Sequence, residues 1–394
     1  MIERRHRARV VPVSALLSVA LLIAGCGASG GGAAKAPTGW PQAVAQARGQ
    51  TVRWWMYGGD AATNAYVDGY IRPAAARLGV HLERVPITET SEAVSRVAAE
   101  RRAGKRSGGA VDLIWINGSD FAAGKSAGLW LKNWTGHLPN MRFVDSASPI
   151  ISRDFQVPVE GQESPWEGAA FIYGYNAAQV SSPPTTLPGL LAWARTHHGR
   201  FTYPAPPDFT GAAFVRQVIQ RLGGERQGLA FLKELRPFQY QHGRVFPQSS
   251  DELDQLFANG QVSFDMSYNA NFLNLGVRSG KFPSTVRPLL IGGGALENTS
   301  YVTIPANASH IAGAEVLANL LLAPPLQADL EKPAILGMPS VLSPQRLPAA
   351  LAGLLHRSAS TSPYILASLG QPLTELPSGE VEPINAAWTR EVLR

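Results

Sequence analysis

The sequence is nearly free of cysteine, since Cys26 is the single cysteine among 394 residues. The chain can therefore form no internal disulfide, and its stability must come from packing of an apolar core. Apolar residues make up 45% of the chain, which is enough for such a core, and the length suggests two domains. Beyond the N-terminal segment no stretch reaches 18 consecutive apolar residues, so no further membrane span is expected.

Signatures of common catalytic sites are also lacking. There is no His-x-x-x-His, His-Glu-x-x-His or Ser-x-x-Lys pattern. The segment NGSDFAAGKSAG (117–128) contains Gly-Lys-Ser, but five residues separate Gly118 from Gly124 where a P-loop has four, and Ser119 stands in place of the first glycine. We therefore expect Lys125 to be an exposed helix residue. No catalytic residue, cofactor or metal site is predicted.

Two other function classes stay open at this point. The carboxylates Asp112, Asp154 and Glu167 could pair in a glycosidase, although sequence cannot show their separation. An exported hydrolase of carbohydrate or peptidoglycan is therefore an alternative, and a surface adhesion module is another.

The first 25 residues have the pattern of an export signal. Arginines at positions 4, 5, 7 and 9 precede an apolar segment at 10–24, which is too short for a comfortable membrane span. Ile23-Ala24-Gly25-Cys26 resembles the lipobox of bacterial lipoproteins, which predicts lipid attachment at Cys26; an ordinary signal peptide is the alternative. Residues 26–47 would then be a flexible tether, and the protein would lie lipid-anchored on the outer face of the cytoplasmic membrane, periplasmic or cell-surface.

The charge of the chain does not suggest a nucleic-acid partner. The formal net charge is +6, and it falls to +3 when residues 1–25, with four arginines and one glutamate, are removed. Such a small excess, without a concentrated basic surface, argues against nucleic-acid binding.

The pattern of apolar residues predicts two α/β units. Strands at 51–57, 80–85 and 110–116 alternate with helices at 61–78 and 91–103, which is typical of a parallel, doubly wound sheet. The pattern then restarts and is followed, from residue 309, by a mostly helical tail. In this second unit, before the tail, the expected strands are 169–176, 201–204, 261–268 and 299–305, and the expected helices include 186–198 and 249–259.

Candidate binding residues gather where predicted strands end. Ligands of open parallel sheets bind outside the carboxyl ends of the strands. The candidates share an aromatic face, a short polar side chain or an accessible backbone amide, and they are Trp55, Tyr57, Gly58, Gly59, Asn117, Gly118, Tyr203, Asp208, Phe209, Thr210, Tyr268 and Asn269. Core packing is the alternative for the aromatic residues, and at least one of Trp54 and Trp55 must be core because adjacent strand residues point oppositely. A helix cap is the alternative for Asp208 and Thr210.

Four segments carry a resemblance to a known family. They are WWMYGGDAATNAYVDGYI, DLIWINGSDF, SPWEGAAFIYGYN and RFTYPAPPDFTGAAF. Together with the lipoprotein-like start they resemble the solute-binding proteins of bacterial ABC importers, and within them the YnjB-type branch. The resemblance implies a type II periplasmic-binding-protein-like α/β fold, with two lobes joined by a hinge and a helical C-terminal tail. It also implies a monomer that traps a solute by closure and delivers it to a membrane permease, whose ATPase is a separate chain.

The predicted lobe boundaries follow from this resemblance and from the restart of the pattern. Lobe 1 would comprise residues 48–170 plus 295–394, and lobe 2 residues 171–294.

The class of solute is less constrained. Consecutive tyrosines, typical of ferric-ion binders, are missing, which disfavours bare iron. Aromatic residues interleaved with Asp60, Asp208 and Asp265 would suit an organic cation, such as a thiamine-like compound or a polyamine. An anion seated on the amides of Thr210 and Gly211, at a helix start, is the competing hypothesis.

Overall fold

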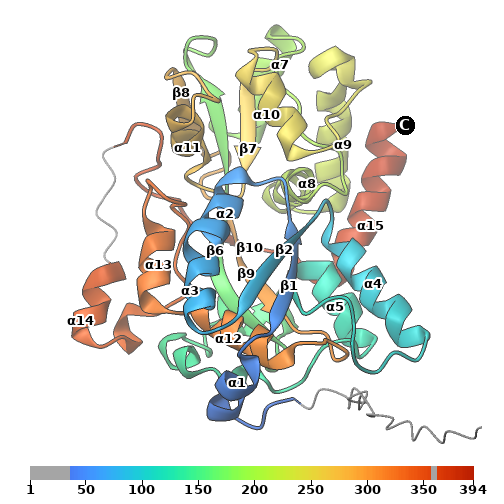
Figure 1. Ribbon diagram of the computed structural model, residues 1–394. Coiled ribbons are helices and arrows are strands. Elements are labelled where there is room, and N and C mark those ends of the chain that lie inside the picture. Colours follow the sequence, from blue (N-terminus) through green and yellow to red (C-terminus); the bar gives the residue numbers. More distant parts are fainter. Residues whose placement is uncertain (1–35, 356–361) are drawn as a thin grey trace, which may run out of the picture. The chain divides into compact units, whose positions relative to one another are not determined.

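The computed structural model describes residues 36–355 and 362–394 (Figure 1). Within these residues, one eight-stranded sheet has the strand order β2-β1-β3-β9-β6-β7, with β10 paired to β9 and β8 to β6. Its strands are β1 (Thr51–Tyr57), β2 (His81–Ile87), β3 (Leu113–Ile116), β6 (Glu163–Asn176), β7 (Phe264–Ser267), β8 (Val286–Leu289), β9 (Leu296–Thr303) and β10 (Leu373–Thr374). The short strands β4 (Arg153–Asp154) and β5 (Val157–Pro158) form a separate antiparallel pair. The predicted export signal and Cys26 lie outside the described residues.

Helices cover this sheet, and we group them by the strands they accompany. The first lobe contains β1–β3 with α2 (Ala61–Tyr66), α3 (Arg72–Arg77), α4 (Thr90–Arg102), α5 (Gly118–Ser126), α12 (Ile311–Leu321) and α13 (Pro324–Glu331). The second lobe contains β7 and β8 with α7 (Leu187–Thr196), α8 (Phe209–Arg221), α9 (Glu225–Leu235), α10 (Ser250–Ala258) and α11 (Phe272–Arg278). The remaining helices are α1 (Trp40–Ala47), α6 (Pro149–Ser152), α14 (Ala349–Ala352) and α15 (Ser378–Trp388).

The first lobe is built on β1, which lies between β2 and β3 and is parallel to both. Its side chains alternate between the two faces of the sheet. Trp54 is fully buried in the larger core, where its ring meets Trp166 edge to face, whereas Trp55 packs against a smaller core on the opposite face. The single predicted helix at 61–78 is α2 and α3, joined by a π-helical turn at Val67–Ile71 just before Pro73.

The parallel pairing expected of the strands at 51–57, 80–85 and 110–116 is confirmed in β1, β2 and β3, but the sheet becomes mixed beyond β3. Strand β9 is antiparallel to β3 and to β6, and β6 is antiparallel to β7 and β8. Strand β9 follows β3 and β6 by more than a hundred residues in the chain. Its direction depends on pairing between distant segments, and the local spacing of apolar residues does not show such pairing.

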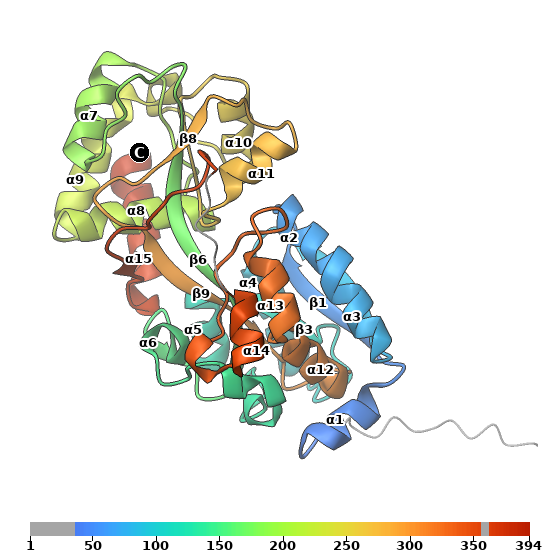
Figure 2. The ribbon, with the colours of Figure 1, turned by 90° about the vertical axis from the view of Figure 1, so that its left-hand side faces the viewer.

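Strand β6 connects the two lobes. Its residues 163–171 pair with β9, and residues 172–176 pair with β7 and β8 (Figure 2). The sequence pattern predicts only the part from residue 169 onward, because Pro165 and the irregular register between Pro165 and Glu167 interrupt the preceding segment. The single strand is therefore shared between the core of one lobe and the core of the other.

Residues 201–204 do not form the strand expected of them. They run through the core of the second lobe, but prolines at 204, 206 and 207 lack amide donors and cannot continue a ladder. Helices α9 and α11, in contrast, were not anticipated from the sequence; α9 buries Leu229, Phe231 and Leu232 against the second lobe.

The two ends of the described chain pack onto the lobes. Residues 40–47, expected to belong to the flexible tether, instead form α1, which buries Ala43 and Ala47 and packs against α12. Helix α15 packs against α5 of the first lobe and against α8 and α9 of the second, where the Trp388 indole donates to the Tyr203 hydroxyl at 2.8 Å. Among the described residues, no single helix is long and apolar enough to cross a membrane; α12 and α13 meet those criteria only as a pair, with a 56° bend between them.

Candidate functional site

A cavity of about 930 Å³ lies between the two lobes. The first lobe contributes Tyr57 and Trp115, and the second contributes Phe209 and Tyr268. Residues of β6 and β9, the strands that continue from one part of the sheet to the other, also line it. The cavity therefore has walls from both lobes and a strand pair beneath it.

Most of the residues predicted from strand ends line this cavity. They are Tyr57, Gly59, Asn117, Gly118, Asp208, Phe209, Thr210, Tyr268 and Asn269. Gly59 lies under the Tyr57 ring so closely that a Cβ atom would come within 2.2 Å of the tyrosine hydroxyl oxygen. Gly118 has a φ of 61°, a left-handed conformation that glycine adopts without strain.

Three predicted residues do not line the cavity. Tyr203 is completely buried in an aromatic cluster with Phe214 and Phe246 and bonds to Trp388, so its assignment to the cavity is wrong. Trp55 faces the smaller core, and Gly58 is held by a bond from its amide to the Ile87 carbonyl. Each lies close in sequence to a lining residue, but strand alternation or tertiary packing turns it elsewhere.

Helix N-termini at the cavity are occupied by carboxylates of the chain itself. Asp60 caps α2, accepting bonds from the amides of Ala62 at 2.9 Å and Thr63 at 3.0 Å. At the start of α5, the Gly118 amide donates to the Asp154 carboxylate at 2.6 Å. These amides are therefore already paired with negative charge.

Asp208 has the role of a double cap. Its Oδ1 accepts from the Gly211 amide at 2.8 Å at the start of α8, and its Oδ2 accepts from the Ser250 amide at 3.1 Å at the start of α10. The Ser250 hydroxyl adds a further bond at 3.3 Å. Burial raises the pKa of Asp208, while these hydrogen bonds oppose the rise. The cap that the sequence left as an alternative for Asp208 is thus present in the structure.

Acidic side chains outnumber basic ones around the cavity. Eight carboxylates line it, namely Asp60, Glu89, Asp120, Glu167, Asp208, Asp251, Asp254 and Glu382. The lining cations are Arg216, Arg278 and Lys281. Burial, together with neighbouring carboxylates, raises the pKa of Glu89 to about 7 and that of Asp120 to about 6. Crowded negative charge without matching cations makes ionisation of these carboxylates unfavourable.

Two of the three lining cations are already paired. Arg216 of α8 forms a bidentate pair with Glu375 at 2.8 and 2.9 Å, and both side chains are buried. Lys281 pairs with Asp254. Asp265, expected at the site, lies behind this pair rather than in the cavity lining, and burial raises its pKa well above the usual range.

The sequence pattern missed several lining residues. Glu89, Asp120 and Trp115 lie next to predicted strand ends, so the rule that pointed to Asn117 could have included them. Glu167 and Ser300 offer no such signal, because they lie within strands and reach the cavity only through the pairing of β6 with β9.

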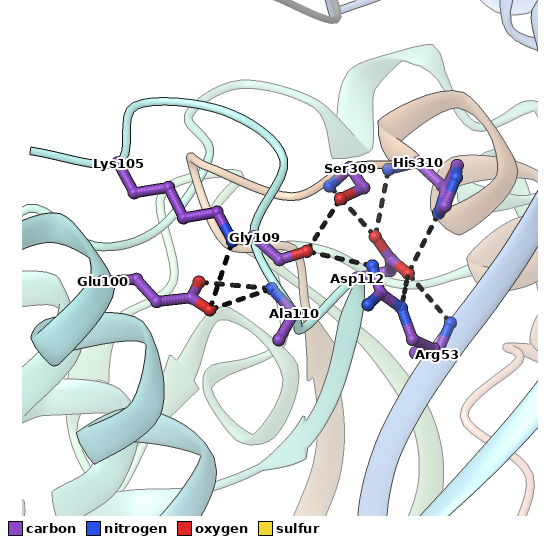
Figure 3. Close-up of polar contacts among 8 residues, drawn as sticks. All are labelled: Arg53, Glu100, Lys105, Gly109, Ala110, Asp112, Ser309 and His310. Atoms are coloured by element: carbon purple, nitrogen blue, oxygen red, sulfur yellow. Dashed lines mark hydrogen bonds and ion pairs between the residues drawn. The ribbon is translucent and has the colours of Figure 1, made fainter. Parts of the chain in front are cut away.

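Two of the carboxylates considered for a hydrolase, Asp112 and Asp154, accept hydrogen bonds from the chain itself. Asp112 is fully buried within the first lobe and does not line the cavity. It accepts bonds from the amide and Nε of Arg53 at 3.0 and 3.1 Å and from the amides of Ser309 and His310 at 3.0 Å (Figure 3). Asp154 is engaged by Gly118. The bonds of Asp112 fasten β1, the loop before β3 and the start of α12 to one another.

Neither a P-loop lysine nor a metal-ligand cluster is found within residues 36–355 and 362–394. Lys125 lies at the end of α5, where it pairs with Glu160 at 2.9 Å, rather than at a helix start as in a P-loop. Among the described residues, no group of three or more His, Cys, Asp or Glu side chains is placed to hold a metal ion.

Comparison with known proteins supplies a family context for this geometry. Residues 69–344 match the family model described as bacterial extracellular solute-binding protein. Protein YnjB of Escherichia coli (strain K12) is 36% identical over 326 residues, which cover 78% of this chain and 84% of that protein.

Solved structures share the fold at much lower identity. The periplasmic binding protein AfuA of Actinobacillus pleuropneumoniae, solved with fructose-6-phosphate, is similar with a TM-score of 0.63 and 13% identity, covering 87% of this chain and 98% of that one. A putative spermidine/putrescine ABC transporter protein of Listeria monocytogenes is similar with a TM-score of 0.61 and 12% identity, covering 86% and 98%. The fold is that of the type II periplasmic binding proteins.

Proposed function

We propose that this chain, which belongs to the family of bacterial extracellular solute-binding proteins, binds an organic cation in the cavity between its lobes. Its family makes it the extracytoplasmic component that binds solute for an ABC importer. The proposal concerns the class of solute, for which we favour a polyamine or a thiamine-like compound. The observation that carries it is the excess of carboxylates over free cations around the cavity.

A cation would be favoured there for two physical reasons. Negative charges in a partly desolvated cavity attract a positive ligand more strongly than they would in water. Aromatic rings of Tyr57, Trp115 and Phe209 line the same space and can cover the apolar parts of the ligand or contact its charge.

The competing hypothesis of an anion at Thr210 and Gly211 has less support. The Gly211 amide donates to Asp208, so an anion would have to displace a carboxylate that also holds α10. The starts of α2 and α5 are occupied in the same way. An anion would meet amides that are already paired, and the lining carboxylates that are ionised would repel it.

The proposal also covers how the solute is held. Strand β6 is shared between the lobes, so a change in its path would move one lobe relative to the other. A ligand that contacts both walls stabilises the closed arrangement by the contacts it gains there. The protein would act by binding and release without chemical conversion of the solute, as a monomer anchored by a lipid on Cys26.

Calorimetric titration tests the solute class directly. We expect spermidine, putrescine or thiamine to bind, and to raise the melting temperature in proportion to the logarithm of ligand concentration. Inorganic phosphate and fructose-6-phosphate serve as anionic controls and should produce neither effect. Binding of the anions but not of the cations would overturn the proposal.

The anchor is tested separately by cell fractionation. We expect Cys26→Ser to release the protein from membranes, because the chain has no other thiol to carry a lipid. A variant that stays in the membrane fraction as firmly as the wild type would show that Cys26 is not the attachment site.

A further inference from the structure

Beneath the cavity, the paired strands β6 and β9 present a polar floor. Glu167 lies directly opposite Ser300 in the strand register, and Asn298 lies opposite Ala169, two residues away along the same face. All three polar side chains line the cavity, yet they are almost fully buried, with exposed fractions of 1% for Glu167, 4% for Ser300 and 7% for Asn298. We call Glu167, Asn298 and Ser300 the floor.

Two residues of the floor have buried side-chain atoms without a hydrogen-bond partner in the described part of the chain. Glu167 Oε2 has no hydrogen-bond partner among the described residues, and neither does Asn298 Oδ1 or Nδ2. Buried polar atoms are normally paired, because leaving them unpaired costs the free energy of their lost hydration. The capping carboxylates Asp60 and Asp208, by contrast, are held by backbone amides.

The unpaired set is complementary to an N–H group with a positive charge. A carboxylate oxygen and an amide oxygen are acceptors, and together they suit a donor that carries charge. The carboxylate would be most effective at this depth, where water screens it least. Burial and the charge of Asp60 raise the pKa of Glu167 well above its usual range, which a bound cation would reverse.

We infer that Glu167 and Asn298 receive the charged N–H end of the solute, so the solute is a cation that retains N–H donors, such as a primary or secondary ammonium, a guanidinium or a protonated amine heterocycle. This inference rests on the proposed function, in which the solute is an organic cation. It adds that a fully alkylated ammonium is rejected, because it would leave Glu167 Oε2 and Asn298 Oδ1 without donors.

Trp115 supplies an aromatic surface to the cavity that the floor lines. Its ring meets the fully buried Trp166 edge to face, at 5.1 Å between ring centroids. The Trp115 ring can contact the carbon chain of a solute whose charged end lies at the floor.

The first experiment compares two ligands of equal charge on the wild-type protein. Putrescine has two primary ammonium groups, and its hexamethyl derivative has the same spacing of charge but no N–H donor. We expect calorimetry to show putrescine binding at least tenfold more tightly than the derivative. Equal affinities would overturn the inference while leaving a cation-binding function intact.

The second experiment removes the charge from the floor. Glu167→Gln is nearly isosteric, and we expect it to weaken putrescine binding at least tenfold. The matched control is Glu225→Gln, which removes an exposed carboxylate of α9 that does not line the cavity and should change affinity less than twofold. Equal losses in the two variants, or no loss in Glu167→Gln, would overturn the inference.

The outcomes separate the two proposals. If neither putrescine, spermidine nor thiamine binds the wild type, the cation proposal and the inference both fail. If thiamine binds and neither polyamine does, the cation proposal stands and the inference is overturned, because the positively charged nitrogen of thiamine carries no N–H. If Glu167→Gln does not fold, the comparison of putrescine with its hexamethyl derivative decides the inference on the wild-type protein alone.

Discussion

Asp112 and Glu167 are both buried carboxylates, one just before a strand of the sheet and one within a strand, and they differ in how the chain satisfies them. Asp112, on the loop before β3, accepts bonds from Arg53, Ser309 and His310 (Figure 3). Glu167, on β6, faces the cavity with one oxygen unpaired among the described residues. The comparison teaches that burial alone does not identify a binding residue; a buried carboxylate that also lines the cavity with an unpaired oxygen is the better candidate.

The largest effect on stability is expected for Asp112→Ala, which removes the carboxylate that the chain satisfies. The substitution leaves the Arg53 guanidinium and the amides of Ser309 and His310 without their shared acceptor. We expect the free energy of unfolding to fall by about 3 kcal/mol or more. Urea unfolding measures this loss, and calorimetry at a temperature where the variant is folded should show solute affinity within twofold of wild type.

Asp208 lies at the cavity but resembles Asp112 in being satisfied by the chain. Asp208→Ala removes the cap of α8 and the bond to the start of α10, so we expect a loss of about 2 kcal/mol in stability. The loss should be larger than that of Asp208→Asn, since the amide retains one acceptor oxygen. Thermal melting of the two variants checks this order; a loss of solute affinity without a loss of stability would show that Asp208 contacts the solute instead.

The stability of the protein should depend on pH through Glu89 and Asp120, two carboxylates of the cavity lining. In the folded protein the pKa of Glu89 rises from 4.5 to about 7 and that of Asp120 from 3.8 to about 6. The folded state therefore binds a proton on each of these carboxylates more tightly than the unfolded chain does. This contribution is complete below about pH 4 and is lost as the pH rises through 6 and 7.

Glu89→Gln isolates that contribution. Because water screens part of the Glu89 side chain, we expect the decline in unfolding free energy between pH 5 and pH 8 to shrink by about 1 kcal/mol in the variant. Urea unfolding of both proteins at the two pH values measures the difference. Parallel declines would mean that Glu89 titrates normally in the folded protein.

The smallest effect on stability is expected at Glu167 itself. Glu167→Gln removes a carboxylate that the empty protein does not satisfy, so we expect the free energy of unfolding to change by less than about 0.5 kcal/mol or to rise slightly. Thermal melting without ligand measures it. A loss as large as that of Asp112→Ala would place Glu167 among the structural carboxylates and remove the contrast.

The sequence by itself determined much of the local structure. Helices α4 and α10 and strand β1 follow from the spacing of their apolar residues, and the strand-end rule found Tyr57, Asn117, Asp208 and Tyr268 at the cavity. These features depend on neighbours a few residues apart, which a sequence displays directly. The resemblance to solute-binding proteins also rested on such contiguous segments, and the family match confirms it.

Only the tertiary structure decided which of these residues face the solute. Tyr203 and Tyr57 both follow a run of apolar residues, but Tyr203 is buried against Trp388 from the C-terminal helix, whereas Tyr57 lines the cavity. The antiparallel entry of β9 places Ser300 opposite Glu167 from a position more than a hundred residues away in the chain. Whether a side chain is paired, buried or left facing a ligand depends on contacts between distant segments, and local periodicity does not encode those contacts.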